Sequence, residues 1–413
     1  MYAYRTLRVE IPWRLVEERP DVLDLVTRMR LAAEEYVRRL LKEVTGQEES
    51  GLTAEELDRL LTPDRRELAV KIIEEVFPKY DLKKYFVNQG KVFWRDVVFH
   101  RAVPLDAQLR IENERDVGRA VFVDLRSEVL KVRRLNETFV VRLRRNDIAW
   151  IRERLEEGAK LKLAFLGVER RRGREPTYGK LYIALVFARE TAPVEPKAVV
   201  AVDVNRLDHG IMVGLLVDGK IVRRMRLLDE GAVRELRRLH EEISRLDERA
   251  AREADPARKR RLEDRARHLA SKRFRKMRDV VIRIAGEIIK LAREHQAVIV
   301  LDTMEDESYR ELKEGDGSGV RKHFLDGLGQ LRRRLQTLAE WYGLPYLEER
   351  LYSTICPRCG AKMEGLSNRR MHCPSCGFSD HRDNVPLIWA KKRYWELLQK
   401  QPAFSATILL LTS

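Results

Sequence analysis

The sequence predicts an α/β domain in the C-terminal half of a 413-residue chain, preceded by a region that is mostly β. Two stretches carry this prediction: residues 198–203 read AVVAVD and residues 297–302 read AVIVLD. Such short runs of small or branched apolar residues are typical of strands that are covered on both faces of a sheet. Helical periodicity between the two runs predicts the covering helices. Each run ends in an aspartate, so a charged carboxylate is expected at the end of each buried strand.

The first 196 residues predict a β-rich domain with a helical insert. A strand is expected at 4–11, and helical periodicity follows over 22–44 and 54–76. Residues 82–101 mix aromatic and basic side chains, which suits a nucleic-acid surface as well as the edge of a core. Four further strands, rich in β-branched and aromatic residues, are expected at 120–125, 139–143, 161–168 and 181–188. This pattern indicates a small antiparallel barrel or sheet.

A domain boundary is expected at 191–197, TAPVEPK, because two prolines in seven residues interrupt regular structure. The strand at 198–202 follows. The next strands, 210–217 and 220–227, are joined by an Asp-Gly turn, a strong hairpin signal. A long basic helical region then covers about 230–294.

The second half of that helical region has one apolar face. Its members recur every three or four positions and are expected in the core: Phe274, Met277, Val281, Ile284, Ile288 and Leu291. The opposite face is rich in Arg and Lys, which suits a phosphate backbone as well as simple solvation. A helix at 320–342 and an edge strand at 346–350 complete the pattern. The order of these elements matches an RNase H-like mixed sheet, in which acids from separate strands and a late helix meet.

Charge favours a polyanionic partner. Lys and Arg exceed Asp and Glu by 82 − 66 = 16, and charged residues make up 36% of the chain. A surplus of this kind is most often matched to nucleic acid, although heat-adapted proteins also carry highly charged surfaces. The N-terminus lacks the apolar core of a signal peptide and no apolar run is long enough to span a bilayer, so a cytoplasmic protein without a membrane partner is expected.

Asp203 and Asp302 are expected to face each other at the ends of neighbouring strands. Two carboxylates held close repel one another, and a divalent ion relieves that repulsion. Mg²⁺ takes oxygen ligands, and a pair of such ions supports phosphodiester cleavage. A third acid is expected late in the chain, where SDHRDNVPLIWAKK (379–392) offers Asp383 just before a helix, with Asp380 nearby. The alternative for each acid is a cap or turn residue.

The four cysteines of the chain all lie within residues 356–376, in the pattern C-x2-C, thirteen residues, C-x2-C. Four thiolates close a tetrahedral shell around one structural Zn²⁺ and leave no position for a water. The predicted ligands are Cys356, Cys359, Cys373 and Cys376. Gly360 and Gly377 follow the second and fourth cysteines, as zinc-knuckle turns require. The loop at 368–370, Asn-Arg-Arg, suits nucleic-acid contact or solvation equally. Clustered thiols also favour a reducing, intracellular setting.

These motifs together resemble the TnpB/OrfB family of insertion-sequence proteins, relatives of the type V CRISPR effectors. The resemblance rests on AVDVN, VIVLD and YSTICPRCG…CPSCGFSDHRDN and covers about 197–392. It implies a RuvC nuclease core at 197–351, a zinc ribbon at 352–380, and a final RuvC helix and tail at 381–413. Over 1–196 the layout alone suits a wedge-type β-barrel with a helical recognition insert.

The resemblance further implies an RNA-guided, Mg²⁺-dependent DNA endonuclease of a mobile element. Its catalytic acids would be Asp203, Asp302 and Asp383, in three successive motifs. Its partners would be a guide RNA from the element's own transcript and a double-stranded DNA target, which also implies association with the nucleoid. The oligomeric state stays open, with a homodimer as one option.

Three positions depart from the family pattern. Asp302-Thr303 stands where Glu-Asp is usual, and Glu305 is the nearest glutamate. Asp383 is followed directly by Asn384 and then Val-Pro, where Asp-x-Asn-Ala-Ala is usual, and Asn205 stands where Gly is common. These departures leave two other functions open. One is a guide-dependent DNA-binding repressor that has lost cleavage. The other is a zinc-ribbon RNA-binding protein without nuclease ancestry, in which the three aspartates would lie far apart.

Overall fold

The structure is a computed structural model. It describes residues 2–12, 38–39, 42–43, 46, 102–105, 107–133, 139–170, 178–204, 207–303 and 319–395. The helices expected at 22–44 and 54–76 and the aromatic and basic stretch at 82–101 lie largely outside these residues. The chain divides into two compact units, Tyr2–Glu190 and Thr191–Ser413. Within the described ranges, none of the helices combines the length and the apolar character that a bilayer span requires.

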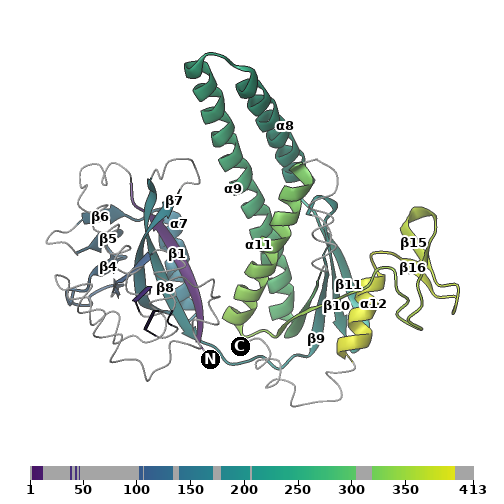
Figure 1. Cartoon of the computed structure of the whole chain (residues 1–413). Helices are drawn as coiled ribbons and strands as arrows, with labels where there is room; N and C mark the ends of the chain where they lie inside the picture. Colours follow the sequence, from purple (N-terminus) through teal and green to yellow (C-terminus); the bar gives the residue numbers. More distant parts are fainter. Residues whose placement is uncertain are drawn as a thin grey trace. The chain divides into compact units, whose positions relative to one another are not determined.

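The first unit contains two four-stranded sheets (Figure 1). One has the order β1-β8-β7-β2 and is formed by Tyr2–Glu10, Tyr178–Glu190, Lys160–Arg170 and Ala102–Leu105. The other has the order β3-β4-β5-β6 and is formed by Ala107–Arg110, Val121–Asp124, Val129–Val132 and Phe139–Arg142. The strands predicted near 4–11, 120–125, 139–143, 161–168 and 181–188 are therefore all present.

The sequence prediction for this unit omitted α7, Arg145–Glu156. Ile148 and Ile151 recur at helical spacing in it and are both buried, a signal that would have located the helix. The omission reflects the charge of the segment, since seven of its twelve residues are Arg, Asn, Asp or Glu and conceal the short apolar stripe.

The second unit is built on a five-stranded mixed sheet with the order β11-β10-β9-β12-β13. Its strands are Lys220–Leu227, Ile211–Val217, Ala198–Asp203, Ala297–Asp302 and Tyr346–Glu349. β9, β10 and β11 are antiparallel neighbours, whereas β12 and β13 run parallel to β9. The predicted hairpin is confirmed, because Asp218 and Gly219 both have positive φ, as a tight turn between two antiparallel strands requires.

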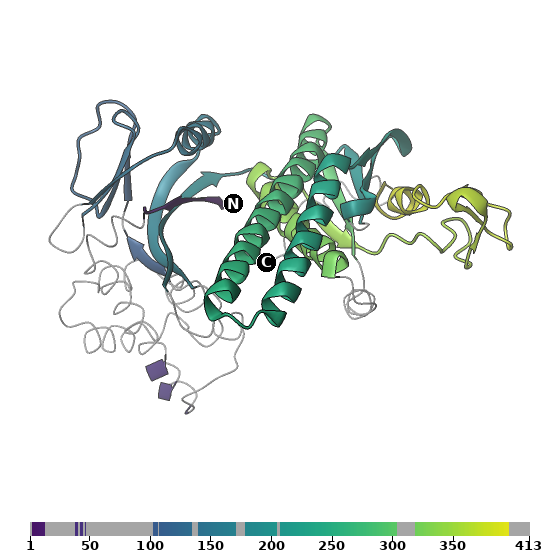
Figure 2. The same cartoon turned by 90° about the horizontal axis from the view of Figure 1, so that it is seen from above.

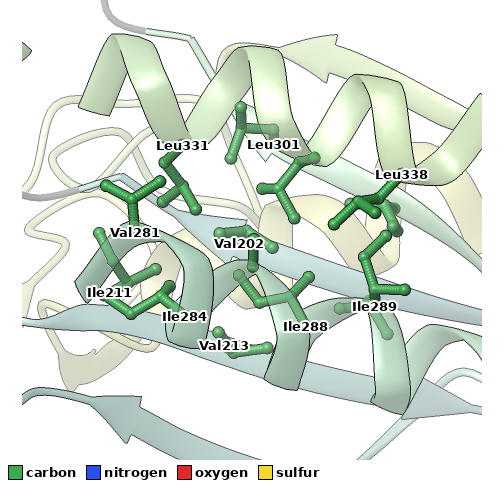
Figure 3. Packing of buried hydrophobic residues seen from close by; sticks show 14 of the residues in the cluster. Val202, Ile211, Val213, Val281, Ile284, Ile288, Ile289, Leu301, Leu331 and Leu338 are labelled. Atoms are coloured by element: carbon green, nitrogen blue, oxygen red, sulfur yellow. The ribbon is translucent and has the colours of Figure 1, made fainter. Parts of the chain in front are cut away.

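Helices cover both faces of this sheet, as the apolar strands predicted. All six residues of β9 are buried. On one face, α9 (Pro256–Glu294) and α11 (Gly319–Tyr342) pack over residues such as Val202 and Leu301 (Figure 3). On the other face lies α12 (Val385–Ala390), whose Leu387 and Ala390 share a core with Ala201 and Val300. Helix α11 ends at Tyr342, and the next residue, Gly343, has a φ of +67° that provides the left-handed turn into β13.

The long basic region forms two helices, α8 (Glu230–Arg252) and α9, which lie side by side (Figure 2). Asp255 accepts a hydrogen bond from the Ala257 amide and Pro256 opens α9, so the break falls at a standard helix start. Buried residues of α8 recur at helical spacing: Ala232, Leu236, Leu239, Ile243, Leu246 and Ala250. The prediction that Phe274 belongs to the core was wrong, since this side chain is 59% exposed. The other five predicted core positions of the region are buried.

The segment between β13 and α12 forms a small three-stranded sheet with the order β14-β15-β16. Its strands are Glu364–Gly365, Arg370–His372 and Ser379–His381. The chain leaves β16 and enters α12 through Asp383 and Asn384, so the small sheet is joined directly to the helix that covers the large one. Pro386 stands in the first turn of α12, as predicted.

Candidate metal centres of the second unit

Asp203 and Asp302 end neighbouring parallel strands. β9 and β12 pair in register from Ala198 and Ala297 up to Val202 and Leu301, and the two aspartates are the next residue of each strand. Parallel strands that end at the same edge of a sheet place their last side chains together. Asp203 is only 6% exposed. The structure therefore brings two of the three predicted acids together at one edge of the sheet.

Both carboxylates lie on the face of the sheet that α12 covers. Side chains alternate between the faces of a strand, so Asp203 shares a face with Ala201, and Asp302 shares one with Val300. Ala201 and Val300 pack in the core that includes Leu387 of α12. The helix that follows the third predicted acid thus covers the face that holds the first two.

Asp302 is the carboxylate whose ionisation the fold opposes most clearly. Burial raises the pKa of Asp302 to about 7, the backbone N–H of Leu351 opposes this rise, and the nearby negative charge of Asp203 adds to it. The Leu351 amide donates to Oδ1 of Asp302 at 2.6 Å. Arg350 lies close enough to lower the pKa slightly. A half-buried carboxyl that is close to a second carboxylate and poised near neutrality is the arrangement that a divalent cation stabilises.

Asp383 is engaged differently. Nη2 of Arg369 donates to Oδ1 of Asp383 at 2.5 Å, and Nδ1 of His381 lies 3.7 Å from Oδ2. Arg369 belongs to the loop that the sequence suggested for nucleic-acid contact or solvation. Neighbouring Asp380 accepts a hydrogen bond from Nδ2 of Asn384 at 2.8 Å and so holds the side chain of the residue that precedes α12.

The three aspartates do not form a closed trio. Within the part of the chain that the structure describes, the four cysteines are the one group of three or more His, Cys, Asp or Glu side chains whose ligand atoms all lie within 4.8 Å of one another. Asp203 and Asp302 form a pair, and Asp383 stands at the start of α12 in an ion pair with Arg369. Sequence reasoning named these acids but missed Arg350 and the Leu351 amide, which act on Asp302 from beyond the edge strand.

Leu387 holds α12 against the face of the sheet that carries Asp203 and Asp302. Its truncation tests whether the helix is held there. Its side chain is fully buried, and a Cβ added at Gly214 of β10 would lie 2.8 Å from its Cδ1. Leu387→Ala is expected to cost roughly 2–5 kcal/mol, because the cavity would lie between helix and sheet. Urea unfolding measures this loss. The same change at Leu366, which is 52% exposed, is the control, and equal effects of the two variants would show that α12 is not held in this way.

The cysteine cluster has the geometry of a four-thiolate metal site. The Sγ atoms of Cys356 and Cys376 lie 3.5 Å apart, as do those of Cys359 and Cys373. Zn–S bonds of about 2.3 Å in a tetrahedron place sulfurs roughly 3.8 Å apart, close to these separations. Each ligand pair thus fits the edge of a zinc tetrahedron, and four thiolates are the donor set that structural zinc prefers.

Two matching turns position these sulfurs. The Gly360 amide donates to the Cys356 carbonyl, and the Gly377 amide donates to the Cys373 carbonyl, both at 2.9 Å. Gly360 has φ of +78° and Gly377 has φ of +71°, a conformation that side chains rarely adopt. The prediction that these glycines complete two knuckle turns is confirmed. Beneath the turns lies a small core of Met363, Met371, Phe378 and Val385.

One family model matches part of the chain. The model of the Cas12f1-like TNB domain matches residues 329–385, which span the second half of α11, β13, the cysteine cluster and the first residue of α12. No curated protein matches the chain. Solved structures include the complex of Cas12f1 with sgRNA and target DNA, at 11% identity and TM-score 0.47, with 93% of this chain and 86% of that chain covered.

Two further solved structures are similar at the same low level of identity. The chain of a CRISPR-Cas12f ternary complex is 11% identical, with TM-score 0.33, and the match covers 91% of this chain and 83% of that chain. The mini-RNA-guided endonuclease CRISPR-Cas_phi3 is 11% identical, with TM-score 0.36, and the match covers 64% of this chain and 57% of that chain.

Proposed function

We propose that this chain is a TnpB-like relative of the type V effectors and acts as an RNA-guided, Mg²⁺-dependent DNA endonuclease of a mobile element. The observation that carries the proposal is the pair of aspartates at the ends of β9 and β12, on the face that α12 covers. Metal-assisted hydrolysis of a phosphodiester needs ligands that hold the ions where a nucleic-acid backbone can approach them, and paired carboxylates supply such ligands.

In this proposal the mixed sheet is a RuvC core of RNase H-like type. The strand order β11-β10-β9-β12-β13, with one hairpin and two parallel neighbours, supports it. The core spans 197–351, the zinc ribbon 352–380, and the final helix and tail 381–413. Residues 1–196 form the wedge barrel with its recognition insert, for which the two four-stranded sheets of the first unit are the framework.

The carboxylates fit Mg²⁺, which takes oxygen ligands and needs only one or two carboxylates for each ion. Asp203 and Asp302 would hold the metal, with Asp383 as the third catalytic acid. When bound, Mg²⁺ activates the attacking water and stabilises the leaving oxygen. The raised pKa of Asp302 means that cation binding displaces a proton from this carboxyl near neutrality. One structural zinc on the four cysteines keeps the ribbon folded next to α12.

The ion pair between Arg369 and Asp383 supports a second function, a guide-dependent DNA-binding repressor that has lost cleavage. In that function Arg369 permanently neutralises Asp383, the third acid. Asp302, which stands where the family usually has glutamate, then does not perform the role of that glutamate. In the nuclease, Asp383 exchanges Arg369 for a metal ion. The two functions share a guide RNA and a double-stranded DNA target and differ only in catalysis.

Guided cleavage tests the proposal. The chain is co-expressed with its flanking genomic DNA, the ribonucleoprotein is purified, and a DNA library matched to the guide is added with Mg²⁺. We expect cutting that requires the guide, the metal and Asp203, and therefore no product from the Asp203→Ala protein. Asp279→Ala, an exposed acid of α9, is the matched control and should cut normally.

Binding without cutting separates the remaining functions. If the ribonucleoprotein binds target DNA in a guide-dependent way but yields no cleavage product, the nuclease proposal is wrong and the repressor is favoured. Retention of RNA with no effect of a matching DNA sequence would contradict both and would favour a zinc-ribbon RNA-binding protein.

A further inference from the structure

Phe274 is an exposed aromatic side chain in a strongly basic stretch of α9. The stretch 271–278 reads SKRFRKMR, so five of its eight residues are basic. Phe274 is 59% exposed, whereas Met277, three residues later, is buried. Leaving a large apolar ring in water forgoes the free energy of its burial. Aromatic rings interleaved with Arg and Lys are also the surface on which single-stranded bases stack.

The basic residues around Phe274 fall into two groups. Lys272 and Lys276 pair with Glu235 of α8 at 3.5 and 2.7 Å, and Arg273 lies 2.7 Å from His240, so these three serve the contact between α8 and α9. Arg275 and Arg278 are exposed, and among the described residues no ion pair joins either of them to a carboxylate. Arg278 follows Phe274 by one helical turn and therefore lies on the same side of α9.

Arg334 of α11 adds a second guanidinium. Its Nε is buried and has no hydrogen-bond partner. Burial and the positive charge of nearby Arg278 both lower the pKa of Arg334. The neighbouring arginines of α11 differ, because Arg332 forms an ion pair with Glu348 and Arg333 is exposed to solvent. A half-buried guanidinium beside a like charge is unfavourable, and an anion between the two groups relieves the repulsion.

Close packing of α9 and α11 sets the positions of Arg278 and Arg334 along the two helices. A Cβ added at Gly327 of α11 would lie 2.8 Å from Sδ of Met277, so the helices approach closely there. Leu331 and Val281 pack in the same core and are adjacent in Figure 3. The core thus fixes the alignment of the two helices. Arg334 begins roughly 9 Å further along the helix axis than Arg278, a gap that two long arginine side chains can span.

We infer that Phe274, Arg278 and Arg334 bind one nucleotide of a single-stranded nucleic acid, with its phosphate between the two guanidiniums and its base against the phenyl ring. Guanidinium groups recognise phosphate through paired hydrogen bonds. The base must be unstacked to reach the ring, which excludes a regular duplex. RNA and DNA share this chemistry. This inference rests on the proposed function in one respect, namely that the ligand is a nucleic acid.

Fluorescence anisotropy of the full chain with labelled single strands of about 12 nucleotides tests the site. No magnesium is added, and RNA and DNA of one sequence are measured separately. Phe274→Ala is expected to weaken binding roughly tenfold without changing its dependence on salt. Arg334→Gln is expected to reduce the slope of log Kd against log salt concentration by about 0.7, the loss of one phosphate contact. A loss confined to RNA assigns the site to the guide, and one confined to DNA assigns it to a separated target strand.

Each test variant has a matched control. Val222→Ala truncates another exposed apolar side chain, which is 56% exposed, and Arg333→Gln removes the next, solvated arginine of α11. If either test variant equals its control with both strands, or the parent chain binds neither strand, the inference is wrong. Phe274 is exposed, so its truncation preserves the fold even if Arg334→Gln lowers the melting temperature. Cleavage is measured separately. If the chain cuts DNA but fails these binding tests, only the nucleotide site is wrong. If it passes the binding tests but does not cut, only the proposed nuclease activity is wrong.

Discussion

Asp302→Asn is expected to stabilise the fold and to slow cleavage strongly. The pKa of Asp302 is raised to about 7, so the folded state retains a proton that the unfolded chain loses near pH 4. The associated stability is fully present below pH 4 and is lost as the pH rises through 7. An asparagine at this position stays neutral, and its side-chain oxygen still accepts the hydrogen bond from the Leu351 amide. At pH 8 without metal, the variant should therefore be more stable by roughly 2–4 kcal/mol.

Urea unfolding at pH 4 and pH 8 measures this difference in the free energy of unfolding. The gain should appear at pH 8 and vanish at pH 4. Asp279→Asn makes the same chemical change on an exposed face of α9 and should have no effect on stability at either pH. Guided cleavage by Asp302→Asn should fall roughly a hundredfold or more, because a metal ligand is lost. Unchanged stability at pH 8 would mean that Asp302 is ionised in the folded chain and that the proposed site does not oppose its charge.

Loss of zinc is expected to unfold the ribbon and leave the large sheet intact. The ribbon core consists of Met363, Met371, Phe378 and Val385 with two of the cysteines, which is too little buried surface to hold a fold without a metal. The sheet that contains β9 and β12 has its own, much larger core. Chelation, or Cys373→Ser, should therefore expose the ribbon arginines, such as Arg370, to trypsin.

Metal analysis of the purified chain should find one zinc for each protein, and none in Cys373→Ser. Ser375→Ala lies in the same knuckle between two ligands and should retain the zinc. Circular dichroism should change little on chelation, because the helices and the five-stranded sheet persist. Trypsin resistance of the ribbon after complete zinc removal would show that the small core suffices and that the cysteines serve another purpose.

Local sequence determined much of the second unit. The runs AVVAVD and AVIVLD became buried neighbouring strands because short, continuous apolar runs rich in β-branched residues are typical of strands with both faces covered. The Asp-Gly pair formed its hairpin because both residues accept positive φ. Cysteine spacing determined the four-sulfur cluster because each C-x2-C turn places two thiols on one side.

Periodicity failed at Phe274 for a physical reason. A helical pattern reports which side of a helix is apolar, but not how far along the helix another element covers that side. Helix α9 buries nearly every position of its apolar stripe from Met277 to Ala292, and only Ala266 before it. Phe274 lies in the part where the cover ends, so the same pattern yields an exposed ring.

The sequence by itself determined the strands, the turns, the sulfur ligands and the identity of the acidic residues, because each depends on residues within a few positions of one another. Only the tertiary structure decided which acids meet. Asp203 and Asp302 lie together because β9 and β12 pair in register across almost a hundred residues of chain, whereas Asp383 pairs with Arg369 of the ribbon. Such pairings depend on how whole elements pack, and no local pattern encodes the partner of a charge.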